Sequence, residues 1–110
     1  MDFNKILEEI KANLLALVNK KFFEYKKEGK KDMEAFIKQS EEKLKRWTKA
    51  LENKDIDLDD FEWLVKSQKD LLVMNVLYQT GISKIKLGHF KNSVVKTIIK
   101  TVSDLVLNKE

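Results

Sequence analysis

The sequence predicts an all-α protein, a helical bundle of three to four helices, and three observations lead to this fold class. The chain of 110 residues has no proline and only three glycines, so few positions interrupt a helix. Apolar residues recur every three or four positions over long stretches, which is the period of a helix with one buried face. Apolar residues at 43% and charged residues at 36% also argue against disorder and favour a single domain over residues 1–110.

The first half of the chain carries one continuous apolar stripe. Its members, spaced three or four residues apart, are Phe3, Leu7, Ile10, Leu14, Val18, Phe22, Tyr25, Gly29, Met33, Phe36, Ser40, Leu44, Trp47 and Leu51. Residues 3–52 form either one long helix, with Gly29 at a close crossing, or a helical hairpin broken near Gly29 with Asp32 as the N-cap of the second helix. We favour the hairpin, because a single helix of that length cannot bury its stripe within so short a chain.

The segment KDIDLDDFEWLV, residues 54–65, places five acidic residues before an apolar run and suggests a calcium loop. Asp55, Asp57 and Asp59 alternate as the first ligands of such a loop do. The sixth position, which requires glycine for a sharp turn, is Asp60, and the twelfth, which requires a bidentate glutamate, is Lys66. The segment therefore fails at both diagnostic positions, and we predict no metal site there.

A helix start explains the same residues better. Asp59 is the predicted N-cap, Glu62 completes a capping box, and Leu58 with Trp63 forms the hydrophobic staple. The helix is expected to run from Asp60 to about Thr80, with Gly81 directly after its end.

The second part of this predicted helix, residues 71–78, is apolar nearly all round, apart from Asn75 in its middle. Such a segment lies in the centre of the core or under a second chain. A buried amide must pair its donors and acceptor, so Asn75 either bonds a backbone carbonyl or water, or pairs across an interface and fixes the subunit number.

A last helix is predicted from about Gly88 to Leu107, after a single helical turn between Gly81 and Gly88. Its apolar residues cover roughly half of a helical wheel. They are Phe90, Val94, Val95, Ile98, Ile99, Val102, Leu105 and Val106.

Residues suited to catalysis are scarce, so we expect the protein not to be an enzyme. His89 is the single histidine and cysteine is absent, which leaves no basis for a catalytic triad or a zinc site. No glycine-rich phosphate loop occurs either. We predict no catalytic residue, no cofactor and no metal.

Protein–protein interaction is the function that the sequence favours. Three wide apolar faces, on the first helix, on residues 71–78 and on the last helix, exceed what one small bundle comfortably hides. We therefore expect a self-associating, homo-oligomeric assembly or adaptor module, with a monomeric bundle that covers all three faces as the alternative. The interface candidates are Leu71, Met74, Asn75, Tyr78, Val95 and Ile99.

Sequence-independent nucleic-acid binding is the alternative function, because the net charge of +4 is unevenly distributed. The candidate basic patch consists of Lys20, Lys21, Lys26, Lys27, Lys30, Lys31, Lys96 and Lys100. Arginine, the commonest base-reading residue, occurs only once. A membrane surface, bound by the first helix lying flat on it, is the least favoured partner, since its glutamates weaken attraction to anionic lipid. The N-terminal segment lacks the order of a secretory signal, so we expect a cytoplasmic protein.

Overall fold

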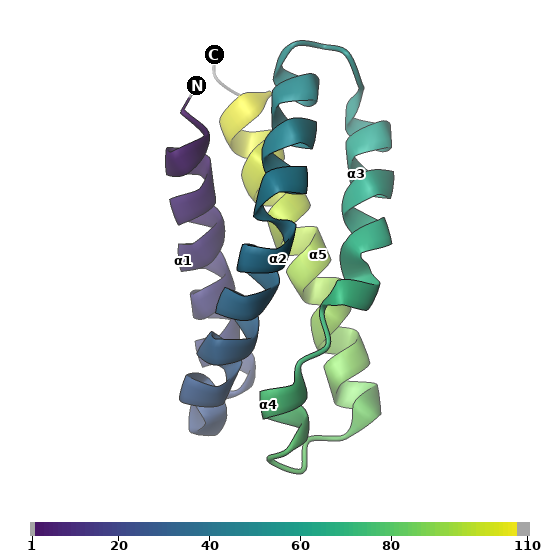
Figure 1. Ribbon diagram of the computed structural model, residues 1–110. Coiled ribbons are helices and arrows are strands. Elements are labelled where there is room, and N and C mark those ends of the chain that lie inside the picture. Colours follow the sequence, from purple (N-terminus) through teal and green to yellow (C-terminus); the bar gives the residue numbers. More distant parts are fainter. Residues whose placement is uncertain (1, 108–110) are drawn as a thin grey trace.

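The computed structural model describes residues 2–107, except for the side chain of Leu71. The predicted all-α bundle is confirmed, and no strand occurs in this part of the chain. Four longer helices, α1 (Phe3–Lys21), α2 (Lys26–Glu52), α3 (Leu58–Ser67) and α5 (Lys84–Val106), lie side by side (Figure 1). The shorter segments η1 (Phe23–Tyr25), η2 (Gln68–Leu71) and α4 (Asn75–Tyr78) connect them.

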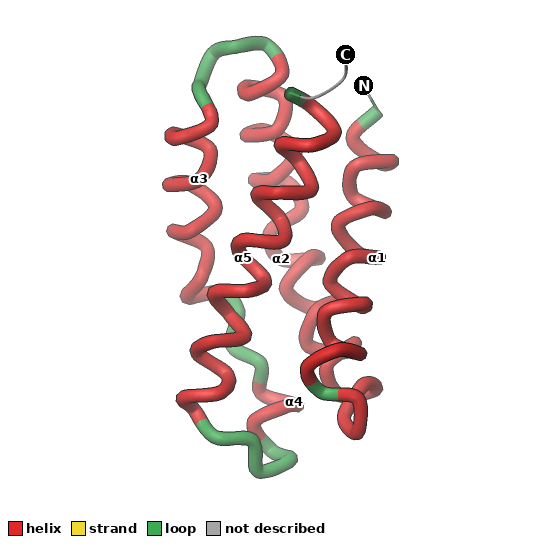
Figure 2. Tube along the Cα trace, turned by 180° about the vertical axis from the view of Figure 1, so that it is seen from behind, coloured by secondary structure: helices red, strands yellow, loops and turns green. Residues whose placement is uncertain are grey.

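The bundle is elongated, with principal extents of 43 × 22 × 20 Å, and its two ends are built from different loops. The α2–α3 loop, the start of α1 and the last turn of α5 lie at one end (Figure 1). The α1–α2 turn, α4 and the α4–α5 loop lie at the other, as the view from behind also shows (Figure 2). Segments far apart in sequence therefore share each end.

Residues 3–52 form the hairpin that we favoured, but the chain breaks at Phe22 rather than at Gly29. Phe22 has a non-helical backbone (φ −134°, ψ 53°), and its N–H donates to the Val18 carbonyl at 2.7 Å to close α1. Gly29 lies within α2, where a Cβ would come 2.5 Å from Val18 Cγ1. Gly29 thus has the role that the one-helix alternative assigned to it, because its missing side chain lets the two helices approach closely.

Asp32 is a helix cap, although for a different helix from the predicted one. It lies inside α2 and is buried, and its carboxylate accepts the N–H groups of Val76 at 3.1 Å and Leu77 at 2.8 Å. Those are N–H groups of the first turn of α4, which has no capping side chain of its own. Asp32 therefore caps a short helix 44 residues further along the chain.

The predicted continuous helix from Asp60 to Thr80 is wrong, because α3 ends at Ser67 and residues 72–74 are irregular. Met74 there has a left-handed backbone (φ 52°). The break buries Leu72 and Met74 while Val73 between them faces solvent. A regular helix would spread these apolar side chains around its circumference, whereas the irregular segment places Leu72 and Met74 in the core.

Asn75 is exposed, so the prediction of a buried amide within an apolar helix is also wrong. It is the first residue of α4 and directly follows the left-handed Met74. The chain turns there, so Asn75 faces solvent while Leu77 enters the core.

The last helix begins earlier than predicted, at Lys84 rather than Gly88. Ser83 is its N-cap and accepts the Lys86 N–H at 3.2 Å. Gly81 has a positive φ of 97° in the turn after α4, which agrees with its predicted place behind a helix end. The predicted apolar half of α5 is confirmed, since all eight of its residues are buried or half-buried.

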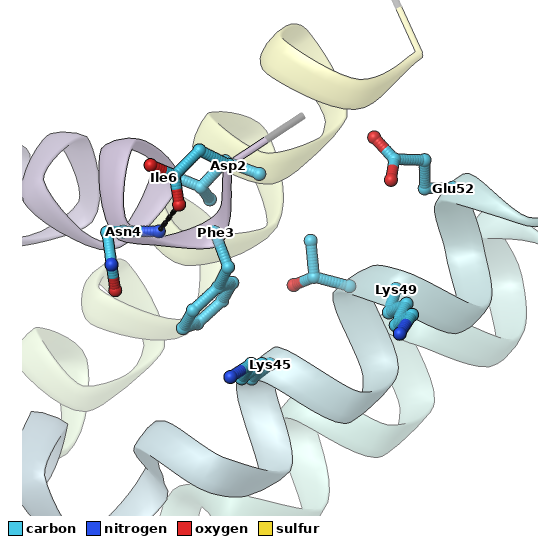
Figure 3. Close-up of a pocket in the computed structure, with 8 residues that line it drawn as sticks. Asp2, Phe3, Asn4, Ile6, Lys45, Lys49 and Glu52 are labelled. Carbon is cyan, nitrogen blue, oxygen red and sulfur yellow. Dashed lines mark hydrogen bonds between the residues drawn. The ribbon is translucent and has the colours of Figure 1, made fainter.

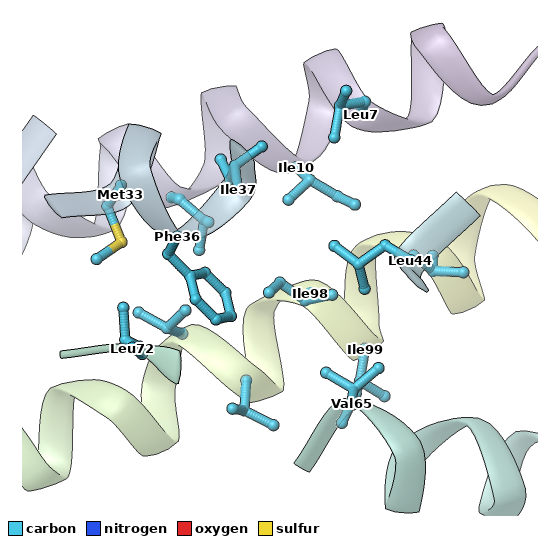
Figure 4. Packing of buried hydrophobic residues seen from close by; sticks show 14 of the residues in the cluster. Leu7, Ile10, Met33, Phe36, Ile37, Leu44, Val65, Leu72, Ile98 and Ile99 are labelled. Carbon is cyan, nitrogen blue, oxygen red and sulfur yellow. The ribbon is translucent and has the colours of Figure 1, made fainter. Parts of the chain in front are cut away.

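One core cluster joins the four longer helices (Figure 4). Every member of the predicted stripe over residues 3–51 is buried or half-buried, as the helical period requires. Ser40 in that stripe donates its hydroxyl to the Phe36 carbonyl at 2.8 Å, so its polar atom is satisfied. At the edge of the core, Asn13 Nδ2 donates to Thr101 Oγ1 at 2.9 Å and links α1 to α5.

Replacing Gly29 with alanine is expected to destabilise the protein by about 1–3 kcal/mol, because the new methyl overlaps the buried and stiff Val18 side chain. The free energy of unfolding by urea measures this effect. Gly88→Ala is the matched control, since Gly88 lies inside α5 and an added Cβ meets no atom within 4 Å. The control should stabilise the protein by about 0.5–1 kcal/mol. Equal effects of the two substitutions would contradict a close α1–α2 crossing.

Replacing Asp32 with alanine is expected to cost about 2 kcal/mol, because it leaves the Val76 and Leu77 N–H groups without an acceptor in a buried place. Asp32→Asn keeps one acceptor oxygen and should lose less. Glu42→Ala, at an exposed position of the same helix, is the control and should change the unfolding free energy by no more than about 0.5 kcal/mol. Hydrogen exchange of the Leu77 amide should accelerate in the Asp32 variants alone.

Candidate functional site

The acidic segment before α3 is a helix cap, with a register two residues earlier than predicted. Asp57, not Asp59, is the N-cap, and its Oδ1 accepts the Asp60 N–H at 2.8 Å. Asp60 Oδ2 in turn accepts the Asp57 N–H at 3.3 Å, so Asp60 takes the place given to Glu62 in the capping box. Among residues 2–107, no three His, Cys, Asp or Glu side chains gather closely enough to hold a metal ion.

The hydrophobic staple moves with the cap. Ile56 and Phe61 occupy its two positions; Phe61 belongs to the core cluster and the partly buried Ile56 packs against it. Trp63, which we had assigned to the staple, is 70% exposed on the outer face of α3. A large aromatic side chain is thereby left at the surface beside the acidic residues.

A small cleft lies between the start of α1 and the last turns of α2 (Figure 3). It has a volume of about 260 Å³ and is lined by Asp2, Phe3, Asn4, Ile6, Lys45, Thr48, Lys49 and Glu52. Asp2 is engaged as the N-cap of α1, where it accepts the Asn4 N–H at 3.0 Å. Thr48 Oγ1 is buried, and no hydrogen-bond partner for it occurs among residues 2–107. A hydroxyl without an adjacent base is not activated as a nucleophile.

The predicted interface residues do not form one exposed face. Met74, Val95 and Ile99 are buried within this chain, whereas Asn75 and Tyr78 are exposed, and the side chain of Leu71 lies outside the described part. The bundle thus covers most of the apolar surface that the sequence predicts to need a partner, although Val73 and Tyr78 stay exposed. The reason given for self-association was wrong, and self-association itself stays a prediction.

The basic patch gathers in part. The six lysines between positions 20 and 31 are all exposed around the α1–α2 turn. Phe23 in that turn is 67% exposed, and Lys26 Nζ lies 5.0 Å from the centre of its ring. Lys96 and Lys100 are exposed but lie about 18 Å or more along α5 from its start, and Lys100 pairs with Asp104 at 3.4 Å.

Two lysines outside the predicted patch lie at this end of the bundle, where Lys96 and Lys100 do not. Lys84 and Lys86, at the start of α5, lie at the same end of the bundle as the α1–α2 turn (Figure 2). A cavity of about 320 Å³ joins the two loops, with Phe22 and Tyr25 on one side and Ile82 and Lys86 on the other. Sequence reasoning missed this grouping, because it depends on how the bundle brings distant loops together.

The two ends of the bundle therefore carry opposite charge. Residues 20–31, at one end, contain six lysines and two glutamates, whereas residues 52–62, at the other, contain six acidic residues and one lysine. We call these the basic end and the acidic end. The modest net charge of +4 conceals this separation.

A groove with apolar side chains lies on the surface between α1 and α2. It has a volume of about 450 Å³, and Leu15, Met33 and Ile37 contribute its apolar side chains. Its charged lining is Lys11, Lys30, Glu34, Lys38 and Glu41. An apolar floor inside a charged rim is the usual form of a groove that binds a partner side chain or helix.

Comparison with protein-family models, with curated proteins and with solved structures finds no match to this chain. Within residues 2–107, none of the helices combines the length and the apolar character needed to cross a bilayer. The function must therefore be inferred from the groove, the two charged ends and the exposed aromatic side chains.

Asp57→Ala is expected to destabilise the protein by about 1 kcal/mol, the usual cost of a lost N-cap. Asp59→Ala is the matched control, because Asp59 is an exposed neighbour in the first turn of the same helix and should cost less than about 0.5 kcal/mol. Thermal unfolding of both variants measures the difference. Added calcium should leave the melting temperature of the unmodified protein unchanged, and a calcium-dependent rise would contradict the capping role.

Proposed function

We propose that this chain is a protein-interaction module without enzymatic activity that self-associates, and that a cytoplasmic location goes with this role. The observation that carries the proposal is the exposure of Trp63 on a molecule that also has an apolar groove with a charged rim. Tryptophan is enriched among the side chains that dominate binding at protein interfaces. Trp63 of one copy, inserted into the α1–α2 groove of another, would bury both surfaces at once.

Charge complementarity supports this arrangement. Three acidic residues, Asp59, Asp60 and Glu62, precede Trp63 in the sequence, and three lysines outnumber two glutamates in the lining of the groove. Opposite charges around an apolar contact speed association and select the orientation of the partners. Trp63 and the groove are different surfaces of the chain. Unless two copies each insert Trp63 into the other's groove, each copy in a pair keeps one of these surfaces unused, and assemblies larger than a dimer can form.

Nucleic-acid binding without sequence preference is the second candidate, favoured by Phe23 among exposed lysines at the basic end. Lysines neutralise phosphates, and an exposed aromatic ring can stack on a base. The affinity for nucleic acid should then fall steeply as the salt concentration rises. An assembly of copies with an apolar centre should lose less affinity over the same range.

Trp63→Ser is expected to reduce the mass in solution towards that of one chain, because it removes the side chain proposed to fill the groove. Light scattering over a series of protein concentrations measures the mass. The unmodified protein should gain mass with concentration, and Lys30→Glu with Lys38→Glu should weaken the assembly through the groove side.

Phe23→Ser is the matched control, because Phe23 is about as exposed as Trp63 but does not line the groove. It should leave the mass unchanged. A mass that stays that of one chain at every concentration, or that falls equally in the control, would contradict the proposal.

A further inference from the structure

Independently of the groove, the end of the bundle formed by residues 20–27 and 78–86 has the composition of a membrane-docking surface; we call it the basic tip. These two segments contain six lysines and one glutamate. Three large apolar or aromatic side chains are exposed among them, with Ile85 at 75%, Phe23 at 67% and Tyr78 at 49%. We propose that the basic tip binds the surface of a bilayer that contains anionic phospholipids.

The exposed apolar residues of the tip do not serve the packing of the bundle. Phe22 turns into the bundle and its ring meets Phe90 edge-on at 4.9 Å, while its neighbour Phe23 points to solvent. Ile85, in the first turn of α5, is more exposed than Trp63. Water disfavours such side chains, and the interfacial layer of a bilayer accepts them.

Part of the positive charge of the tip runs against the usual preference of helix ends, since Lys84 and Lys86 lie in the first turn of α5, whereas Lys20 and Lys21 suit the last turn of α1. The N-termini of α2 and α5 both lie at the basic end, and each carries partial positive charge from its free N–H groups (Figure 1). The first turn of α5 has no acidic residue and instead contains Lys84 and Lys86. The N-terminus of α2 has no side-chain cap from Tyr25, although Glu28 lies in its first turn. Lys84 and Lys86 repel the positive end of the α5 dipole, and an anionic surface relieves that repulsion.

The mixture of side chains favours lipid over the other anionic partners. Ile85 has an aliphatic side chain that cannot stack on a nucleic-acid base but can enter the acyl boundary. Tyr78 has the amphipathic ring that is enriched at membrane interfaces, and Lys84 Nζ lies 5.8 Å from its centre. Lysine stems can lie along the apolar layer while their ammonium groups reach the phosphates.

The tip differs from the membrane mode that we considered from the sequence. That mode required α1 to lie flat with its apolar face in the lipid, but Leu7, Ile10 and Leu14 are buried in the bundle core. The tip needs no unfolding of α1, because its apolar side chains are already exposed. When the tip is docked, the long axis of the bundle would point away from the membrane, and the acidic end would lie in solution.

Co-sedimentation with vesicles tests the proposal. The protein should sediment with vesicles of equal parts phosphatidylcholine and phosphatidylserine, should stay in solution with phosphatidylcholine alone, and should be released by salt. Lys84→Glu with Lys86→Glu should lower the partition coefficient more than about twentyfold, since each lysine contributes about fivefold. Glutamates suit the first turn of a helix, so this variant should keep its fold, which circular dichroism checks.

Ile85→Ser should lower the partition about five- to tenfold through the lost apolar contact. Leu107→Ser, at an exposed apolar position of the opposite end, and Lys43→Glu with Lys45→Glu, at exposed positions of α2, are the matched controls. Trp63→Ser should bind vesicles as the unmodified protein does, which separates this proposal from the assembly proposal. Equal binding to both vesicle types, equal loss in the controls, or binding of a single-stranded oligonucleotide with all vesicles left free would overturn it.

Discussion

The two hydrogen bonds that the Asp32 carboxylate accepts from the N–H groups of Val76 and Leu77 connect α2 to α4, next to the irregular residues 72–74. A helix of four residues such as α4 is not stable alone, since helix nucleation costs more than so few hydrogen bonds return. With its N-terminus tied to α2, α4 fixes the turn that follows it and therefore the place where α5 begins. Because α5 supplies many residues of the core, a buried aspartate in one helix influences the path of two others.

A second constraint, the contact between Gly29 and Val18, sets the spacing of α1 and α2 in the same region. The close crossing lies next to the α1–α2 turn, so it determines where Phe23 and its neighbouring lysines emerge. Asp32 is three residues from Gly29 in the chain. One turn of α2 thus positions both loops of the basic tip, through close packing on one side and through hydrogen bonds on the other.

The regular parts of this fold were predictable because burial alone decides them. A residue such as Leu14 or Val94 follows the helical period, and no contact with a distant segment changes the face of the helix on which it lies. The cap of α3 was missed by two residues because Asp57 and Asp59 both satisfy the local rule, and only the position of Phe61 in the core separates them. The left-handed Met74 and the long-range cap by Asp32 have no local pattern, since tertiary packing and a contact across 44 residues produce them. For the same reason the lysines of one loop were predicted as a patch, but their neighbours Lys84 and Lys86 were not.

The two ends of the bundle differ in how well their residues suit the helix N-termini that lie there. At the acidic end the local rules are obeyed, because Asp57 and Asp60 cap α3 and their charges suit its N-terminus. At the basic tip the first turn of α5 carries Lys84, Ile85 and Lys86, of which two oppose the helix dipole and one is apolar and exposed. Stability alone would favour acidic or polar residues there. Since proteins break local rules mainly where function requires it, the tip is the part of the surface whose composition most needs a partner to explain it.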